Sequence, residues 1–390
     1  MRLLKLQMNG LPNVQAPFLE VTFTNTQRVY QNEIGYEVDH LFNSIYLKKM
    51  MAVIGINASG KTTTLNAIAY TLNTFLSGKG LAYHRVFKRD IQFANYYYHE
   101  ESETLFYHTG TIRNDAFQPR FIDESIYARS VTRKITQHNL YDVQTYTLLK
   151  TRQEVANDAV EGKHLDDKTS ILKGYASFQN KFVIDKLVDE HTKLRSVFIE
   201  NLGELVHQKF VQYLDPSIEI LELQDDIVGI HDANAIYTLK FYGKEPLTVK
   251  ASELTQYLSS GTIKGVDLFI EAYYVIKDGG YLIIDELENH LNKTIVQLLM
   301  QLFVTTANAK GATLVFSTHY TELLDTIERN DLIIVTQKEE GHILLHSMDE
   351  LYGRKDYKKS DVFLSGYLGN TQPEQEKMLD VLTVFYDMTE

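Results

Sequence analysis

The sequence predicts an α/β protein whose mainly parallel sheet is covered by helices on both faces. Near the N-terminus, the apolar run MMAVIG is followed by a glycine-rich loop and then by a helical pattern. From residue 215 onward, strand-like apolar runs alternate regularly with helix-like segments. Parallel strands need such helical crossovers between them, so both observations favour the same architecture.

The first 80 residues predict three strands and a helix. Strand-like runs are LLKLQM, LEVTFTN and the continuous apolar run MMAVIG, which is suited to a buried strand. The next segment keeps its apolar residues on one helical face, because they follow the i, i+3, i+4, i+7 rule. These residues are Leu65, Ile68, Ala69, Leu72, Phe75 and Leu76. The order is therefore strand, loop, helix.

The middle of the chain has a different pattern. Residues 90 to 150 contain tyrosine-rich alternating segments, IQFANYYYHE and ETLFYHTGTI, joined by a short polar stretch, which predicts an antiparallel hairpin. Residues 150 to 210 are polar, and we expect them to be helical. No heptad pattern is sustained long enough for a long coiled-coil arm.

Regular alternation then returns. We expect a helix at about 259–277, closed by Gly279 and Gly280 as C-terminal stop signals, and a second helix ending near Gly311. The expected strands are YTLKFYG, YLIIDE, TLVFSTH, DLIIVTQK and HILLHSM. A short helix is expected after TLVFSTH.

Composition limits the classes of function. The 390 residues carry a net charge of -12, which argues against a broad basic surface for nucleic acid, although short basic runs at 132–134 and 353–359 leave local patches open. There is no cysteine, so disulfides, cysteine-type zinc sites and thiol catalysis are excluded. The N-terminus does not resemble a signal peptide, and no stretch approaches the roughly 20 apolar residues of a membrane span. We expect a soluble, cytoplasmic protein.

The segment GINASGKT, residues 55–62, fits the phosphate-binding pattern G-x-x-x-x-G-K-[ST] between a predicted strand and a predicted helix. In such a P-loop, backbone N–H groups surround phosphate oxygens at the helix N-terminus. Lys61 would reach the β and γ phosphates and Thr62 would bind Mg²⁺. The expected nucleotide-binding residues are Gly55, Asn57, Ala58, Ser59, Gly60, Lys61, Thr62 and Thr63.

Two later strand ends carry the remaining chemistry. YLIIDELENHL places Asp285 and Glu286 side by side, so Asp285 would hold Mg²⁺ and Glu286 would position or deprotonate the attacking water. The alternative is that both carboxylates cap the next helix. TLVFSTHY ends with His319, and parallel strands bring their C-terminal ends to one edge. His319 is therefore expected to contact the γ-phosphate, the alternative being a structural histidine.

The segment QYLSSGTIKG, residues 256–265, would by itself be an N-cap and helix start. The order P-loop, LSSGT, LIIDE and strand-ending histidine, however, resembles the ABC-type ATPases, whose signature motif is Leu-Ser-Gly-Gly-Gln. In that family the signature caps the γ-phosphate bound by a second subunit, so two subunits enclose two ATP molecules. The resemblance implies that Ser259, Ser260 and Gly261 contact the partner's ATP. Ser260 and Thr262 depart from the motif, where the family has Gly and Gln.

Within that superfamily the chain is most similar to soluble RecF-, SMC- and OLD-like ATPases, especially the "AAA family" ATP-binding proteins of restriction-linked and abortive-infection loci. The phrases that carry the similarity are NASGKT, LSSGTIKG, DELENHL, STHYTELLD and RNDLIIVTQKEEGHILLHSMDEL. They imply an ABC-ATPase-like head formed by residues 1–80 and 211–390, with residues 81–210 as a β-hairpin and helical insertion. ABC proteins sense Mg²⁺ with a glutamine in a segment called the Q-loop. Neither Gln92 nor Gln118 is assigned to this role.

The resemblance implies a Mg²⁺- and ATP-dependent homodimer or higher homo-oligomer that switches with ATP hydrolysis and controls a separate effector in bacterial antiphage defence. The alternative is a RecF- or SMC-like ATPase that grips DNA, so nucleic acid stays open as a partner. A transporter subunit is disfavoured because the insertion and tail differ from those subunits. An OLD-type nuclease would need a Toprim domain, for which too few residues follow His319.

Overall fold

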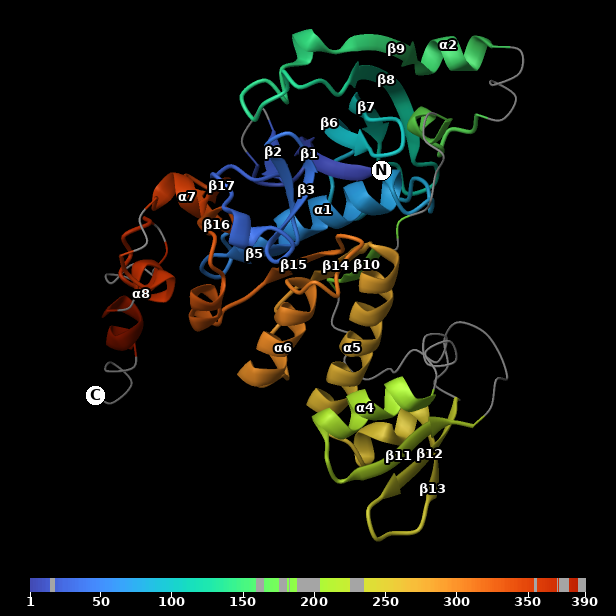
Figure 1. The fold of residues 1–390 in the computed structure, drawn as a ribbon, viewed down its shortest axis with the longest axis vertical. Coiled ribbons are helices and arrows are strands. Elements are labelled where there is room, and N and C mark those ends of the chain that lie inside the picture. Colours follow the sequence, from blue (N-terminus) through green and yellow to red (C-terminus); the bar gives the residue numbers. More distant parts are fainter. Residues whose placement is uncertain are drawn as a thin grey trace.

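The computed structural model describes residues 1–14, 18–158, 165–174, 181, 183–187, 204–224, 235–353, 356–369, 371 and 379–384. Figure 1 shows its layers in order: an antiparallel sheet, helix α1, a mainly parallel sheet, helices α5 and α6, and a small lobe. The predicted α/β architecture, with a P-loop, flanking helices and an antiparallel β subdomain, is confirmed.

The antiparallel sheet begins with the N-terminus. The predicted hairpin is confirmed, since His99 pairs with Thr104 at its turn. Its first strand also pairs with the N-terminal strand, so the tyrosine-rich segments complete a sheet that residues 2–8 start. In spatial order the strands are β2 (Leu19–Thr22), β1 (Arg2–Met8), β6 (Asp90–His99), β7 (Thr104–Arg113), β8 (Arg120–Ser130) and β9 (Thr147–Thr151).

The mainly parallel sheet carries the P-loop. Its strands, in spatial order, are β10 (Val183–Lys186), β14 (Tyr281–Ile284), β15 (Thr313–Ser317), β5 (Met50–Ile54), β16 (Ile333–Glu339) and β17 (His342–Ser347). The first five are parallel and β17 is antiparallel. The prediction that residues 150–210 are helical is wrong at β10, because those four residues pair with β14. The rest of that stretch is only partly described.

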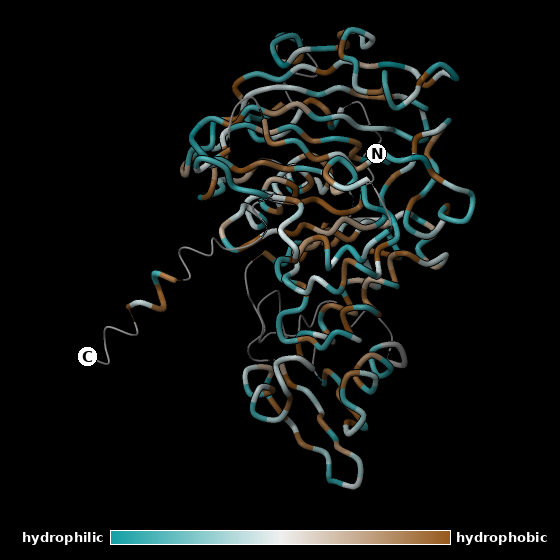
Figure 2. Tube along the Cα trace, turned by 90° about the vertical axis from the view of Figure 1, so that its left-hand side faces the viewer, coloured by the Kyte–Doolittle hydropathy of each residue, from teal (hydrophilic) through white to brown (hydrophobic). Residues whose placement is uncertain are grey.

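Strand β5 is buried along its whole length, and its side chains alternate between two hydrophobic cores. Met51 and Val53 join the core that lies under the antiparallel sheet, around α1 (Lys61–Phe75). Met50, Ala52 and Ile54 point the other way, into the core beneath α5 (Ser260–Asp278) and α6 (Lys293–Phe303). The predicted apolar face of α1 is confirmed as buried. Figure 2 shows the apolar segments inside the main body and residues 379–384 well outside it.

Two predicted elements differ in the structure. Helix α6 ends at Phe303 and not near Gly311, because buried Asn308 donates to the carbonyls of Phe303 and Ala312, both at 2.8 Å, and fixes a turn there. The segment YTLKFYG is a strand outside the parallel sheet. It forms β12 (Ile236–Phe241), the middle strand of the small lobe, between β11 (Ile218–Leu223) and β13 (Leu247–Lys250), with α4 (Glu204–Leu214) packed against β11.

The remaining elements are short. They are the hairpin β3 (Val38–Phe42) and β4 (Ile45–Lys48), the helices α2 (Arg152–Asn157), α7 (Met348–Leu351) and α8 (Lys359–Leu364), and 3-10 turns that include η4 (Ile171–Gly174), η6 (Thr321–Thr326) and η7 (Asn330–Leu332). Within the described part of the chain, every helix is too short or too polar to cross a membrane.

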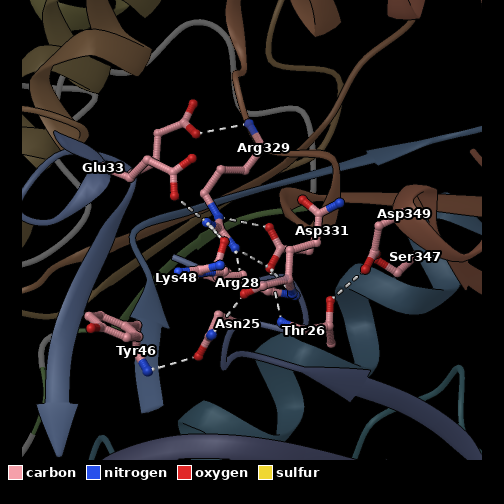
Figure 3. A network of polar contacts seen from close by, with 12 residues as sticks. Asn25, Thr26, Arg28, Glu33, Tyr46, Lys48, Arg329, Asp331, Ser347 and Asp349 are labelled. Atoms are coloured by element: carbon pink, nitrogen blue, oxygen red, sulfur yellow. Dashed lines mark hydrogen bonds and ion pairs between the residues drawn. The ribbon is translucent and has the colours of Figure 1, made fainter. Parts of the chain in front are cut away.

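A buried ionic cluster joins the N-terminal and C-terminal parts of the head (Figure 3). Arg329 is 1% exposed and donates to Asp331 at 2.8 and 2.9 Å and to Glu33 at 2.6 Å. Asp331 also accepts from the backbone N–H groups of Thr26 and Gln27. The guanidinium and carboxylates are thus fully paired, which is the condition under which buried charges are tolerated.

Candidate nucleotide-binding site

The predicted P-loop connects β5 to α1. Gly60 precedes the first helical residue with φ of 113°, a conformation that favours glycine. A Cβ atom at this position would lie 2.6 Å from the side chain of Ile343 on β17, so the space is also closed to a larger residue. The strand, the loop and the N-terminus of α1 therefore form the phosphate-binding arrangement that the sequence predicts.

Lys61 is buried inside the P-loop. Its Nζ donates to the backbone carbonyls of Gly55 at 2.9 Å and Ile56 at 3.2 Å. Burial lowers the pKa of Lys61, and the nearby carboxylates of Asp285 and Glu286 oppose that effect. The ammonium group is thus held at the loop by weak neutral acceptors, which phosphate oxygens would outcompete.

The two predicted metal ligands are in direct contact. The Thr62 hydroxyl donates to Asp285 Oδ2 across 2.6 Å, and the Ser317 hydroxyl donates to Asp285 Oδ1. A hydroxyl and a carboxylate at the start of α1 and the end of β14 are the hard oxygen donors that Mg²⁺ prefers. The residues present therefore fit a Mg²⁺ ion bound together with nucleotide phosphates.

Glu286 and His319 face each other at the mouth of the site, with Glu286 Oε1 3.7 Å from His319 Nε2. Both side chains are partly exposed, so water can reach them. Glu286 adopts φ of 50°, which is uncommon for a residue other than glycine, and its N–H donates to Ser317 Oγ at 2.7 Å. The His319 N–H donates to Glu288 Oε1 at 2.5 Å. Such local strain held by hydrogen bonds is typical of functional sites.

A pocket of about 300 Å³ unites these groups. The predicted residues that line it are Asn57, Ala58, Gly60, Lys61, Thr62, Thr63, Asp285, Glu286 and His319. Gly55 lines a neighbouring pocket with Asn57 and His319, and buried Ser59 lies behind the loop, where its Oγ is 2.6 Å from Thr336 Oγ1. Asn13, Lys338 and Ile343 line the main pocket without having been predicted.

The LSSGT segment is not in this pocket. Ser259 is the N-cap of α5 and its Oγ accepts from the Thr262 N–H at 3.0 Å, so the simple helix-cap function is present. Ser260 Oγ lies 3.2 Å from His290 Nδ1, in the turn that follows Glu286. A Cβ atom on Gly261 would lie 2.4 Å from the His290 carbonyl oxygen. This contact within the chain is enough to require glycine at position 261.

Sequence reasoning missed three residues that shape the site. The Ser317 hydroxyl hydrogen-bonds both members of the acidic pair, Asp285 and the Glu286 N–H, and Thr336 joins the back of the P-loop to the Ile54 carbonyl at 3.0 Å. The Lys186 carbonyl on β10 accepts from the Asp285 N–H at 3.1 Å. A polar side chain directly after an apolar run was the available signal for Ser317, which ends β15, and for Thr336 in β16. Nothing comparable marks Lys186.

Comparisons with known proteins give one family. A family model described as "AAA domain, putative AbiEii toxin, Type IV TA system" matches residues 50–325. No curated protein matches the chain. One solved structure, an SMC head bound to the C-winged helix domain of ScpA, shares 13% identity, with 90% of this chain and 99% of that chain covered at a TM-score of 0.44. The chain belongs to the AAA-domain family whose model matches it from the start of β5 to η6.

Proposed function

We propose that the chain is a Mg²⁺-dependent ATPase that works as an ATP-driven homodimer switch and controls a separate effector protein. The observation that supports it best is the single pocket in which Lys61, Thr62, Asp285, Glu286 and His319 meet. A phosphate clamp, two metal-ligand oxygens, a base and a γ-phosphate contact are the parts that ATP hydrolysis needs.

Each side chain has a distinct task in this proposal. Lys61 exchanges its bonds to the Gly55 and Ile56 carbonyls for phosphate oxygens. A Mg²⁺ ion held by Thr62 and Asp285 would neutralise charge on the phosphates. Glu286 accepts the proton of the attacking water, and His319, on the opposite side of the same opening, contacts the γ-phosphate. Ser317 keeps both acidic residues in place through its two hydrogen bonds.

The position of the LSSGT segment supports the proposed dimer. Ser259 and Ser260 lie at an exposed helix N-terminus outside the chain's own nucleotide pocket, where they can donate to an anion on another molecule. In two copies related by a two-fold axis, the LSSGT segment of each copy would contact the ATP bound by the other copy. This arrangement gives two equivalent sites. ATP binding closes this dimer and hydrolysis opens it.

The separate effector and the setting in bacterial antiphage defence rest on the family. Its description names a putative toxin of a type IV toxin–antitoxin system, which is a two-component system. In this proposal the toxic activity belongs to a partner protein that the ATPase controls.

The dimer is tested by sedimentation of the Glu286→Gln protein with and without ATP, and further substitutions are made in this protein. Glu286→Gln should bind ATP without turning it over, and ATP should convert the monomer to a dimer. Ser260→Asp should abolish this dimer, because two like charges at ~4 Å repel by about 4 kcal/mol at an effective dielectric near 20. Ser260→Asn has the same shape without the charge and should dimerise.

The position of Ser260 makes this comparison clean. An aspartate in the first turn of a helix is favourable, so the folded monomer is retained, whereas any side chain on Gly261 would collide with the His290 carbonyl. If Ser260→Asp dimerises with ATP as well as Ser260→Asn does, LSSGT is only a helix cap. Full ATPase activity in Glu286→Gln would separately refute the assignment of the base.

A further inference from the structure

A second pocket lies at the end of α1 that is remote from the nucleotide. Helix α1 has 15 residues, from Lys61 at the P-loop to Phe75 at this pocket, so the two sites are about 22 Å apart along the helix. The pocket, of about 230 Å³, is lined by Thr74 and Phe75 of α1, by the turn at 78–81 and by residues of the 166–173 segment.

The lining of this pocket is positively charged. It contains Lys79, Lys168 and Lys173, and its one acidic residue is Asp166. The Asp166 carboxylate already accepts from the backbone N–H groups of Lys168 at 2.8 Å and Thr169 at 2.6 Å. Lys79 donates to the neutral Asn73 side chain at 3.2 Å. Across the residues that the structure describes, none of the three lysines forms an ion pair, so the pocket has excess positive charge without a counter-ion.

Further basic residues lie in two segments that hydrogen bonds connect, directly or through each other, to the pocket's 166–173 segment. The Leu81 N–H donates to the Lys168 carbonyl at 3.0 Å, and the Phe121 N–H donates to the Asp167 carbonyl at 2.9 Å. Asn114 Nδ2 donates to the His84 carbonyl at 2.8 Å. Together, segments 79–90, 113–120 and 166–173 carry eight basic residues against four acidic ones, in a chain whose net charge is -12. The basic residues are Lys79, Arg85, Lys88, Arg89, Arg113, Arg120, Lys168 and Lys173.

An exposed aromatic ring stands beside this charge. Phe117, in the turn between β7 and β8, is 93% exposed. In the sequence it lies between Arg113 and Arg120, which pair directly across the two strands, and Arg113 also forms an ion pair with Asp90 at 2.8 Å. Basic side chains that follow a phosphate backbone, next to an exposed ring on which a base can stack, are the two elements of single-strand nucleic-acid binding.

We propose that the 230 Å³ pocket and the β7–β8 turn bind a single-stranded nucleic acid, with a backbone phosphate at Lys79, Lys168 and Lys173 and a base stacked on Phe117. A free phosphate compound would satisfy the lysines but would gain nothing from the ring. The two basic runs that stand out in the sequence, at 132–134 and 353–359, do not line this pocket. The site is distinct from the proposed ATP site and does not depend on hydrolysis.

The test is fluorescence anisotropy of a labelled mixed-sequence oligonucleotide of about 20 nucleotides, without ATP, at several salt concentrations. Lys168→Glu combined with Lys173→Glu should weaken binding at least tenfold. It should also reduce the slope of log affinity against log salt by about 1.4, which is two phosphate contacts on a single strand. Phe117→Ala should weaken binding about fivefold or more with little change in slope, because stacking releases no counter-ions.

Two controls locate the effect. Lys209→Glu combined with Lys244→Glu makes the same change of charge on exposed lysines of the small lobe and should bind like wild type. Lys61→Ala should also retain the oligonucleotide, whereas a loss would place the strand in the P-loop and overturn the proposal.

Four further results would overturn it. The first is that wild type leaves the oligonucleotide unbound at 50 mM salt. The second is that the lysine double variant keeps wild-type affinity and slope, and the third is that the small-lobe control loses as much affinity as the double variant. Finally, pyrophosphate could bind in a Lys168- and Lys173-dependent way while the oligonucleotide does not, which would assign the pocket to a small phosphate compound.

Discussion

The hydroxyl of Thr62 and the carboxylate of Asp285 are joined by a 2.6 Å hydrogen bond although 223 positions separate them in the sequence. The bond brings the first turn of α1 against the end of β14, so the two residues that would hold a Mg²⁺ ion lie side by side. It links the phosphate loop directly to the acidic strand end.

Thr62→Val should therefore affect binding only when Mg²⁺ is present. Valine keeps the shape of threonine but supplies no ligand oxygen. We expect ATP affinity measured with Mg²⁺ to fall at least tenfold, and affinity measured with EDTA to change little. Thr62→Ser, which retains the hydroxyl, should bind as wild type does. An equal loss with and without Mg²⁺ would show that Thr62 acts only on the fold of the loop.

Ser317→Ala should separate catalysis from binding. The substitution removes the hydroxyl that donates to Asp285 and leaves the Glu286 N–H without its acceptor, at a cost of about 1–3 kcal/mol. We expect kcat to fall about tenfold or more while KM for ATP stays within a factor of three.

A matched control is Ser360→Ala, because Ser360 is also buried and donates to an aspartate, Asp325, at 2.6 Å, but does not line the nucleotide pocket. It should lose stability without losing kcat. Equal kcat in the two variants would argue against a positioning role for Ser317.

Arg329→Ala should destabilise the protein strongly. The variant leaves Asp331 and Glu33 buried without their cation, and loss of one partner from a buried ion pair costs about 3–5 kcal/mol. Urea unfolding measures this loss. Because Arg329 does not line the nucleotide pocket, the fraction that remains folded should keep its ATP affinity. A change below 1 kcal/mol would mean that the cluster in Figure 3 contributes little.

Glu37 should make stability depend on pH. Burial raises the pKa of Glu37 from 4.5 to about 7, against the lowering effect of two backbone N–H donors, Glu328 and Arg329. Between these pH values the folded protein holds a proton that the unfolded chain has released. The resulting stabilisation is complete below pH 4.5 and is lost as the pH rises through 7.

Relative to Glu37→Gln, the free energy of unfolding of wild type should thus fall between pH 5 and pH 8, by up to about 3 kcal/mol. Denaturant titrations of both proteins at the two pH values give this difference directly. A difference that stays constant, or that grows in favour of wild type at pH 8, contradicts the shift.

The parts predicted from the sequence are those with a strong local pattern. MMAVIG, the loop at 55–62 and the apolar face of α1 are adjacent in the chain, so their order alone specifies strand, loop and helix. Asp285 is predicted because a P-loop needs an acidic metal ligand and this residue ends an apolar strand, and His319 because parallel strands deliver their ends to one edge. Both arguments need only short segments and one rule of sheet geometry.

The parts that were missed depend on distant partners. Strand β10 has only four residues and is defined by pairing with β14, almost 100 positions later. Lys338 and Asn13 reach the nucleotide pocket because the Ile343 N–H donates to the Asn13 carbonyl at 2.6 Å, which ties the β16–β17 hairpin to the N-terminal loop. No local pattern encodes such a contact.

The place of β5 in its sheet constrains how the protein can be made. Its two neighbours, β15 and β16, begin at Thr313 and Ile333, so the ribosome synthesises the P-loop strand more than 250 residues before either neighbour exists. Until then, an apolar strand has two open edges, the kind of nascent segment that aggregates or engages chaperones. Pairing over such sequence distances is slow. The proposed ATP site can therefore form only late in translation, after the C-terminal strands have closed around β5.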